Sequence, residues 1–334
     1  MDKRRSEPAS AGGGLSAADC LVSVVIPAFN RRRTIERAIA SAAAQSHAAL
    51  EIIVVDDHSS DGTADFVRSM GCSRPVRVIE QPDNRGAPEA RNAGLAAARG
   101  AFVAFLDSDD EWRSDKIARQ LARLGECGEA YGACYSGSRC LAEDGHLTYA
   151  MRPTGEGDLR RALLQYNVIG STSTMLARRD ALLAVGGFTP GLSACQDWDL
   201  WLRLAERTRF ACVPDPLAVL YVATDGRIST SGKARLRGYW YMYRRHLRQG
   251  FRAGLADPGM FLAMMGEILM QLDRPRLARR MLYLSWRTKR RSPKRLANWL
   301  LATMRIRPRS YLALALLTQR VEVALRRGAV RQAP

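Results

Sequence analysis

The sequence contains no hydrophobic run long enough to cross a bilayer. A spanning helix needs about 20 consecutive apolar residues, and the longest candidates, residues 296–304 and 311–317, are much shorter. Three basic residues, Lys3, Arg4 and Arg5, open the chain, but small and polar residues follow them. A signal peptide would need an apolar stretch at that place. We therefore expect residues 1–19 to be a flexible tail and the protein to be cytoplasmic.

Paired cysteines and clustered histidines are also missing. The seven Cys are an odd number and form no C-x-x-C pair, which favours free thiols in a reducing compartment over disulfides or a zinc site. The four His, at positions 47, 58, 146 and 246, have no spacing that suits a metal. We assign none of them as a metal ligand.

Acidic residues are scarce in the last third of the chain. The whole sequence of 334 residues has 51 Lys and Arg against 33 Asp and Glu, a net charge of +18. Residues 233–334 hold 24 of the basic residues and 4 of the acidic ones, a net of +20, so the first 232 residues carry −2. This distribution argues against a uniformly basic nucleic-acid-binding protein and predicts two regions with different roles.

Apolar β-branched runs alternate with helical patterns in residues 20–125. Strands are expected where such runs end in polar residues, and helices where apolar residues recur at i, i+3, i+4 and i+7. The expected strands are residues 21–28, 51–55, 75–80 and 101–106, and the expected helices are residues 34–45, 62–70, 87–99 and 114–124, with Ser114 as N-cap. Such alternation predicts a doubly wound, mostly parallel α/β sheet with helices on both faces.

The pattern becomes less regular after residue 130. Strands are expected over residues 130–137, 168–176, 210–213 and 217–222, with a helix over 197–206, and together they complete a mixed sheet. From residue 233 the pattern is helical, with segments near 233–250, 258–272, 275–290, 294–304 and 309–326 separated by Pro258, Pro275, Pro293 and Pro308. Proline is tolerated in the first turn of a helix, so each can mark a new start. The predicted organisation is a tail (1–19), an α/β domain (20–232, with halves 20–125 and 126–232) and a basic helical region (233–334).

Acidic residues follow two of the expected strands, at the edge where ligands bind in sheets of this kind. Asp107, Asp109 and Asp110 repel one another unless a cation joins them, and a hard divalent ion takes one or two carboxylates together with water and phosphate. Asp57, after the neighbouring strand, can accept a hydrogen bond from a base or a ribose. In both places a solvated turn or a helix cap is the alternative.

Two further charged residues suit binding or catalysis. Arg91 lies in an Ala-rich helical segment, where it could balance a phosphate or the acidic cluster, or could be a surface residue. Asp197 lies in the first turn of an expected helix, where the helix dipole favours an ionised carboxylate that can act as a general base. The alternative is that Asp197 or Asp199 only caps this helix, and we favour that role for Asp199.

Five segments together resemble the motifs of family-2 glycosyltransferases of the GT-A fold, in their order and spacing. The resemblance spans about residues 21–228. The segments are SVVIPAFNR (23–31), VVDDHSSDGT (54–63), NRGAPEARNAG (84–94), FLDSDDEW (105–112) and GGFTPGLSACQDWDLWLRLA (186–205). The resemblance implies an inverting enzyme that moves a sugar from a nucleotide-diphosphate sugar, with UDP-hexose favoured, to a hydroxyl of a saccharide or lipid-linked glycan in cell-surface polysaccharide synthesis.

By position, the resemblance implies a role for each motif at the nucleotide. The residues that line the nucleotide pocket would be Pro27, Phe29, Asn30 and Arg31. Asp57 would bind the base, most often uracil, and Arg91 would approach the ribose or the diphosphate. Asp107 and Asp109 would be the D-x-D pair, with Asp107 near the ribose and Asp109 on a Mn²⁺ or Mg²⁺ ion.

The resemblance also implies the residues at the acceptor. Asp197 would be the general base, at the place where the family usually has Glu-Asp. Gln196 replaces that Glu, and together with Trp198 and Trp201 it would contact the acceptor. Many relatives carry a His after the last core strand, where this sequence has none. Arg227 is a candidate for a diphosphate contact instead, and the third metal ligand stays open.

The sequence leaves two questions open: whether the protein is an enzyme, and what the basic helices bind. A non-catalytic scaffold of the same fold that binds nucleotide or glycan is the alternative to an enzyme, although the intact Asp107, Asp109 and Asp197 favour the enzyme. The basic helices, with interleaved Leu, Trp, Tyr and Met, suit an anionic membrane surface on the inner face of the cytoplasmic membrane. They equally suit a bundle packed on the catalytic domain, whereas no motif supports nucleic-acid binding.

Overall fold

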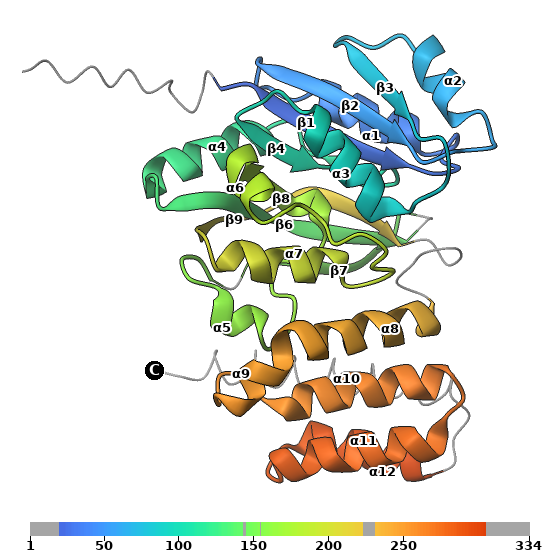
Figure 1. The fold of residues 1–334 in the computed structure, drawn as a ribbon, viewed down its shortest axis with the longest axis vertical. Helices are drawn as coiled ribbons and strands as arrows, with labels where there is room; N and C mark the ends of the chain where they lie inside the picture. The colour runs from blue at the N-terminus through green and yellow to red at the C-terminus, as the bar shows by residue number, and fades with distance from the viewer. Residues whose placement is uncertain (1–19, 143–144, 154, 223–230, 305–334) are drawn as a thin grey trace, which may run out of the picture.

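The computed structural model describes residues 20–142, 145–153, 155–222 and 231–304, and the statements below refer to these residues. A mixed β-sheet with helices on both faces forms one end of the molecule, and the C-terminal helices are stacked in rows at the other end (Figure 1). The predicted α/β architecture with a helical C-terminal region is confirmed.

The first half of the sheet is parallel. Its strands lie in the order β3-β2-β1-β4. They are β1 (Val22–Ala28), β2 (Leu50–Asp56), β3 (Val76–Glu80) and β4 (Phe102–Phe105), connected through α1 (Ile35–Ala43), α2 (Thr63–Ser69) and α3 (Ala87–Ala97). All seven residues of β1 are buried, as its unbroken apolar sequence predicts for a central strand covered on both faces.

The second half of the sheet is mixed. Here β4 pairs with β8 and β8 with β6 in antiparallel fashion, whereas β6 and β9 are parallel. The remaining elements are β5 (Glu111–Trp112), α4 (Lys116–Cys127), β6 (Tyr131–Ala142), β7 (Leu147–Met151), α5 (Arg160–Leu163), η1 (Thr172–Thr174), β8 (Met175–Arg178), α6 (Arg179–Ala184), α7 (Gln196–Ala205) and β9 (Arg209–Val222). Antiparallel pairs also join β5 to β9 and β7 to β6, so the excess of parallel pairs that we predicted is confined to the first half.

Alternate residues of the strands enter two separate cores, one on each face of the sheet. On one face Val24 and Ile26 of β1 pack with α1 and α4. On the other face Val25 of β1 packs with α3, α6 and α7. The period of two along the strand therefore divides the helices between the faces, and the carboxyl ends of β1, β2 and β4 stay uncovered for a site.

Several sequence predictions need correction. Ser114 is not the N-cap of α4, because Asp115 occupies that position, without a side-chain cap bond. The strand predicted over 168–176 begins only at Met175, because Ser171 caps the short helix η1 in front of it. The two strands predicted over 210–213 and 217–222 are one strand, β9. No sequence pattern predicted β5, β7, α5 or α6, and the predicted helix over 309–326 lies outside the described residues.

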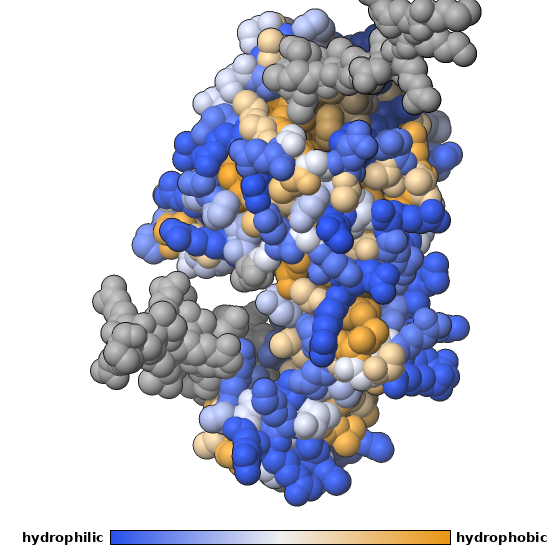
Figure 2. All heavy atoms as spheres, turned by 90° about the vertical axis from the view of Figure 1, so that its left-hand side faces the viewer, coloured by the Kyte–Doolittle hydropathy of each residue, from blue (hydrophilic) through white to orange (hydrophobic). Residues whose placement is uncertain are grey.

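The C-terminal region is helical, as predicted. It consists of α8 (Gly232–Met242), the π-helix η3 (Tyr243–Leu247), α9 (Arg248–Arg252), α10 (Pro258–Gln271), α11 (Pro275–Thr288) and α12 (Pro293–Thr303). Each of α10, α11 and α12 has its proline in the first turn, which confirms those three predicted starts. None of the helices in the described residues has the length and hydrophobicity needed to cross a membrane. On the face that Figure 2 draws, hydrophilic side chains dominate this end and hydrophobic patches are small.

The helical region is attached to the sheet through α7. Met242, Leu247 and Phe261 belong to the same core as α3 and α7. His246 in η3 also makes a 2.7 Å hydrogen bond from Nε2 to Oδ1 of the fully buried Asp199. Because the two parts share a core, their division at residue 232 into separate domains stays a prediction.

Candidate active site

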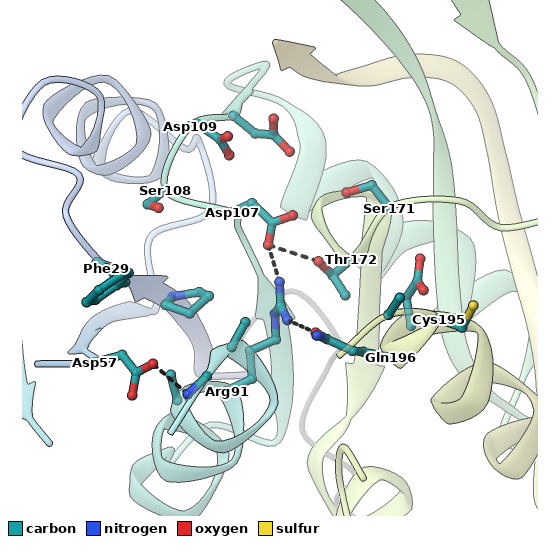
Figure 3. A pocket seen from close by; sticks show the side chains of 18 of the residues that line it. Phe29, Asp57, Arg91, Asp107, Ser108, Asp109, Ser171, Thr172, Cys195 and Gln196 are labelled. Carbon is teal, nitrogen blue, oxygen red and sulfur yellow. Dashed lines mark hydrogen bonds and ion pairs between the residues drawn. The ribbon is translucent and has the colours of Figure 1, made fainter. Parts of the chain in front are cut away.

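A cavity of about 760 Å³ lies beyond the carboxyl ends of β1, β2 and β4. Residues that follow these strands form one wall, and residues of α7 and α8 form the opposite wall. Figure 3 shows Phe29 and Asp57 on one side, Cys195 and Gln196 on the other, and Asp107 with Arg91 between them. We call this cavity the active-site pocket.

The loop after β1 supplies the predicted nucleotide-binding residues. The four predicted residues, Pro27, Phe29, Asn30 and Arg31, all line the pocket. Asn30 adopts a left-handed backbone (φ 53°), and its backbone N–H donates to Oγ of Ser59 at 2.9 Å. Phe29 is 44% exposed. Its position at the pocket leaves a ring face for a flat ligand such as a base.

Asp57 combines a structural role with its place in the pocket. The carboxylate is buried, and it accepts hydrogen bonds from the backbone N–H groups of Arg85 (2.9 Å) and Gly86 (2.7 Å). Gly86 has φ 93°, a conformation that favours glycine. Asp57 therefore holds the loop after β3 against the pocket, and each of its oxygens keeps a further lone pair for a ligand.

Arg91 links the two walls of the pocket. Its guanidinium donates to Oδ1 of Asp107 at 2.6 Å and to Oε1 of Gln196 at 2.9 Å (Figure 3). Thr172 of η1 donates to the same Asp107 oxygen at 3.1 Å. The Arg91 side chain is 9% exposed, so it is not the surface residue that the sequence left as an alternative.

The acidic cluster after β4 divides into two kinds of residue. Asp110 is buried and accepts from Oγ of Ser173 (2.7 Å) and from the backbone N–H of Tyr221 (3.3 Å), so it stabilises the fold. Asp107 and Asp109 are partly exposed and line the pocket. No group of three or more His, Cys, Asp or Glu in the described part of the chain could hold a metal by itself. Two carboxylates fit a Mn²⁺ or Mg²⁺ ion that takes its other ligands from water and a diphosphate.

Asp197 lies in the first turn of α7 and faces the pocket. Oδ2 accepts from Nδ2 of Asn167 at 2.9 Å, and Oδ1 accepts from the backbone N–H of Trp198 at 2.8 Å. The side chain is partly exposed at the pocket, and burial of its carboxyl group raises the pKa to about 6. The sequence reasoning expected a simply ionised carboxylate, whereas the structure describes one with a pKa close to neutral, which suits a general base.

The sequence reasoning missed Asn167. Its own Oδ1 accepts from the backbone N–H groups of Ile169 (3.2 Å) and Gly170 (2.9 Å), which fixes the amide that holds Asp197. The segment Asn167-Val168-Ile169-Gly170 is a turn signal in the sequence, but nothing in it indicates that the amide reaches a carboxylate 30 residues away.

The other predicted acceptor residues differ in their location. Gln196 and Trp198 line the pocket, and the indole N–H of Trp198 donates to the Leu163 carbonyl at 2.7 Å. Trp201 does not line the pocket, because it is fully buried in the core between α7 and the sheet. Its prediction as an acceptor residue is therefore corrected to a core role. Arg227 lies outside the described residues.

Asp199 has a structural role, but it is not the helix cap that we favoured, because Cys195 is the N-cap of α7 and the partners of Asp199 are side chains. Burial by itself would raise the pKa of its carboxyl group, but hydrogen bonds from His246, Arg203 and Thr189 outweigh this and hold the pKa at about 2. The carboxylate therefore stays ionised and joins α7 to η3.

Two pocket residues come from the helical region. Arg235 and Tyr239 of α8 line the pocket, and the Tyr239 ring packs edge-on against Trp198 with 5.8 Å between centroids. The sequence reasoning assigned no site residue to this region, because only the packing of α8 against α7 brings the two side chains to the cavity.

Comparison with known proteins identifies the family. The sequence profile described as "Glycosyl transferase family 2" matches residues 23–186. The TuaG protein of Bacillus subtilis, named as a candidate glycosyltransferase of teichuronic acid biosynthesis, is 32% identical over 226 residues, which cover 67% of this chain and 87% of TuaG. The chain belongs to glycosyltransferase family 2. This confirms the predicted family and the assignment as a glycosyltransferase.

Further relatives and solved structures resemble this chain. The Escherichia coli protein WfgD, a UDP-Glc:α-D-GlcNAc-diphosphoundecaprenol β-1,3-glucosyltransferase, is 40% identical over 106 residues, which cover 32% of this chain and 42% of WfgD. The structure of Staphylococcus aureus TarS 1–349 with UDP-GlcNAc superposes with a TM-score of 0.56 at 17% identity, covering 92% of both chains. The mannosyltransferase PcManGT of Pyrobaculum calidifontis, solved with GDP-Man and Mn²⁺, gives 0.53 at 22% identity, covering 89% of this chain and 86% of that one. These likenesses confirm the predicted GT-A fold.

Proposed function

We propose that this glycosyltransferase moves a hexose from a UDP-sugar to a hydroxyl of a lipid-linked glycan during cell-surface polysaccharide synthesis, with inversion at the anomeric carbon. The observation that carries the proposal is one pocket whose strand-end wall holds Phe29, Asp57, Asp107 and Asp109 and whose opposite wall holds Asp197. The names of TuaG and WfgD and the UDP-GlcNAc complex of TarS support this choice of substrates.

The donor would lie along the strand ends. The exposed ring of Phe29 stacks on the base, and a lone pair of Asp57 accepts a base N–H. Arg91 and Thr172 hold Asp107 in one orientation by their bonds to Oδ1, and Oδ2 then faces the donor. Asp109, together with Asp107, would hold Mn²⁺ or Mg²⁺. When bound, that ion neutralises the charge that develops on the departing diphosphate.

Asp197 would remove the acceptor proton. The acceptor hydroxyl oxygen bonds to the anomeric carbon as the bond from that carbon to the diphosphate oxygen breaks, and the proton goes to the Asp197 carboxylate. Attack from the side opposite the leaving group inverts the configuration. Asn167 and the Trp198 N–H each occupy one Asp197 oxygen, which orients the carboxylate. A pKa of about 6 leaves the group largely ionised at pH 7 and basic enough to accept a proton.

Nucleotide binding and donor turnover test this proposal. A thermal-shift panel of UDP, GDP, dTDP and CMP with Mn²⁺ or Mg²⁺ should give the largest stabilisation with UDP. Slow release of UDP from a UDP-hexose, dependent on Mn²⁺ or Mg²⁺, should accompany it. If UDP binds but no donor is consumed with any acceptor, the protein is a nucleotide-binding scaffold and the proposal is wrong.

We also propose that the helical region attaches the enzyme to the anionic inner surface of the cytoplasmic membrane, where a lipid-linked acceptor would lie. On α11, exposed Arg276, Arg280 and Arg287 alternate with the exposed apolar side chains Leu277 and Leu284. Basic and apolar groups on one surface suit a membrane interface with anionic lipid.

Vesicle flotation tests this attachment. The protein should float with phosphatidylglycerol vesicles at low salt, should be released as salt rises, and should not float with phosphatidylcholine alone. Replacing Arg276, Arg280 and Arg287 by Gln should weaken flotation. If the protein does not float with anionic vesicles at low salt, the basic helices only pack on the catalytic part.

A further inference from the structure

Two side chains of the basic helical region reach the active-site pocket. Arg235 and Tyr239 are one helical turn apart on α8, so they share a face of that helix. They line the same cavity as Asp109 and Asp197. The family profile ends at residue 186, well before this helix. These residues therefore add to the wall opposite the nucleotide side.

Tight packing determines where α8 lies. A Cβ on Gly238 would lie 2.7 Å from the carbonyl oxygen of Ala194, so only glycine permits this approach of α8 to the start of α7. Tyr239 lies between Trp198 (5.8 Å) and Phe261 (6.5 Å), as measured between ring centroids. The face of α8 that carries Arg235 and Tyr239 is therefore directed at the pocket by the fold itself.

Arg235 brings a positive charge that forms no ion pair with a carboxylate among the described residues. Its guanidinium donates to the neutral Oε1 of Gln271 on α10 at 2.7 Å, which steadies the side chain. No carboxylate of the described residues lies within ion-pair distance of Arg235. Arg91, another cation that lines the pocket, is already paired with Asp107. Arg235 interacts electrostatically with the Glu267 carboxyl group of α10, whose pKa burial raises, but it forms no ion pair. Arg235 therefore places a cation on the α7 and α8 side of a pocket that is otherwise rich in carboxylates.

We propose that Arg235 and Tyr239 form a subsite for an acceptor sugar that carries a phosphate or diphosphate, with the phosphate on Arg235 and a face of the sugar ring on Tyr239. A guanidinium binds phosphate oxygens with two parallel hydrogen bonds and retains its charge at every relevant pH. A ring beside it offers an apolar surface to the C–H face of a sugar. This proposal rests on the proposed function, because it assigns the acceptor class of that same pocket.

The subsite explains how the acceptor hydroxyl would meet the base. Asp197 and Arg235 line the same cavity, on α7 and α8 respectively. A sugar bound through its phosphate at Arg235 would extend toward Asp197 and the donor, so a hydroxyl remote from the phosphate would be the one that reacts. An acceptor without phosphate would lose this anchor, and transfer to it would be weaker.

Transfer to two matched acceptors tests the subsite. One acceptor is a monosaccharide linked through diphosphate to a short alkyl chain, and the other is the same sugar as a neutral alkyl glycoside, both in solution without vesicles. Arg235→Gln should raise KM for the diphosphate acceptor about 10- to 100-fold, the effect of losing one charged hydrogen-bonded contact. The neutral acceptor should be used equally by both proteins. Arg237→Gln removes the same charge from an exposed position of α8 and should change neither value.

Other outcomes would overturn the proposal. If Arg235→Gln slows transfer to both acceptors equally, the residue only supports the fold. If it weakens UDP binding instead, the residue belongs to the donor side. Failure of the wild type with every acceptor and donor would contradict the proposed function. The subsite can still be tested in that case by measuring the Kd of the diphosphate compound by calorimetry. Equal Kd values for the wild type and Arg235→Gln would refute the subsite.

Discussion

The sheet region and the helical region use charge in opposite ways. In the sheet region, residues 22–222, Arg91 at the pocket is paired with Asp107 at 2.6 Å. In the helical region, residues 232–304, Arg276, Arg280 and Arg287 are exposed and have no carboxylate within ion-pair distance among the described residues. The positive charge of the second region is therefore available to ligands outside the fold.

Because of this difference, the two regions should contribute differently to the reaction. In the sheet region Arg91 fixes the orientation of Asp107, and Asn167 and the Trp198 N–H fix that of Asp197. Fixed orientations of this kind are what electrostatic preorganisation requires. Among the described residues, the helical region brings a charge to the pocket through Arg235, pairs Arg295 with Asp257, and presents other charges, such as Arg276 and Arg280, at the surface. Substitutions in the two regions should consequently have different effects on donor binding, acceptor use and stability.

Loss of the base should have the largest effect. Asp197→Asn keeps the size of the side chain but cannot accept the proton, so kcat should fall by about 10²–10⁴. UDP affinity should stay within a factor of about two, because Asp197 is placed on the wall opposite Phe29 and Asp57. Asp180→Asn is the matched control, since Asp180 also lies in the first turn of a helix but is exposed. Wild-type turnover by Asp197→Asn would refute the assignment.

Acid should lower the activity of the enzyme by protonating Asp197. Because burial raises the Asp197 pKa to about 6, kcat/KM should fall about tenfold per pH unit below 6 and should level off above it. The raised pKa also affects stability, because the native state binds the proton more tightly than the unfolded state does. Above pH 6 the ionised Asp197 therefore lowers the free energy of unfolding by up to about 3 kcal/mol.

Unfolding measurements provide the control for this pH dependence. Relative to Asp197→Asn, the free energy of unfolding of the wild type should rise as pH falls from 6 to 4. A pH–rate profile that stays flat down to pH 5 would contradict the role of Asp197.

The link between the regions should be measurable as stability. His246→Ala would leave the buried Asp199 carboxylate without one of its donors, and we expect a loss of about 1.5–3 kcal/mol in the free energy of unfolding. His246→Gln can still donate a hydrogen bond and should lose less. Urea unfolding followed by circular dichroism gives both values. Equal stability of His246→Ala and the wild type would mean that the two regions are not joined at this point.

A smaller test concerns the approach of α8 to α7. Gly238→Ala forces a methyl group against the Ala194 carbonyl, and such overpacking should cost about 1–3 kcal/mol and weaken acceptor use more than UDP binding. Gly71→Ala is the control, because a Cβ there meets nothing within 4 Å and the change should stay below about 0.5 kcal/mol. If the two variants are equally stable, α8 does not lie against α7 as described.

The sequence predicted best what depends on local pattern. The unbroken apolar run of β1 and the prolines at the starts of α10, α11 and α12 are local signals, and the structure confirms them. Asp57, Asp107, Asp109 and Asp197 follow strands or open a helix, and the fold brings all four to one pocket. Their order along the chain was sufficient because parallel strands end at one edge.

What the sequence could not predict depends on contacts between distant segments. Trp198 and Trp201 are only three residues apart on α7, and the neighbouring elements decide that one meets the pocket while the other enters the core. Asn167, Arg235 and Tyr239 reach the site only through tertiary packing, so no motif indicates them. The short strands β5 and β7 depend on the longer strands beside them and have no period of their own that a pattern could detect.

One titration tests the division between the regions most directly. UDP is titrated with Mn²⁺ by calorimetry into the wild type, Asp109→Ala of the sheet region and Arg235→Gln of the helical region. The account predicts that Asp109→Ala abolishes Mn²⁺-dependent UDP binding, while Arg235→Gln retains the wild-type Kd within a factor of about two. Equal weakening by the two substitutions, or unchanged binding by Asp109→Ala, would contradict it.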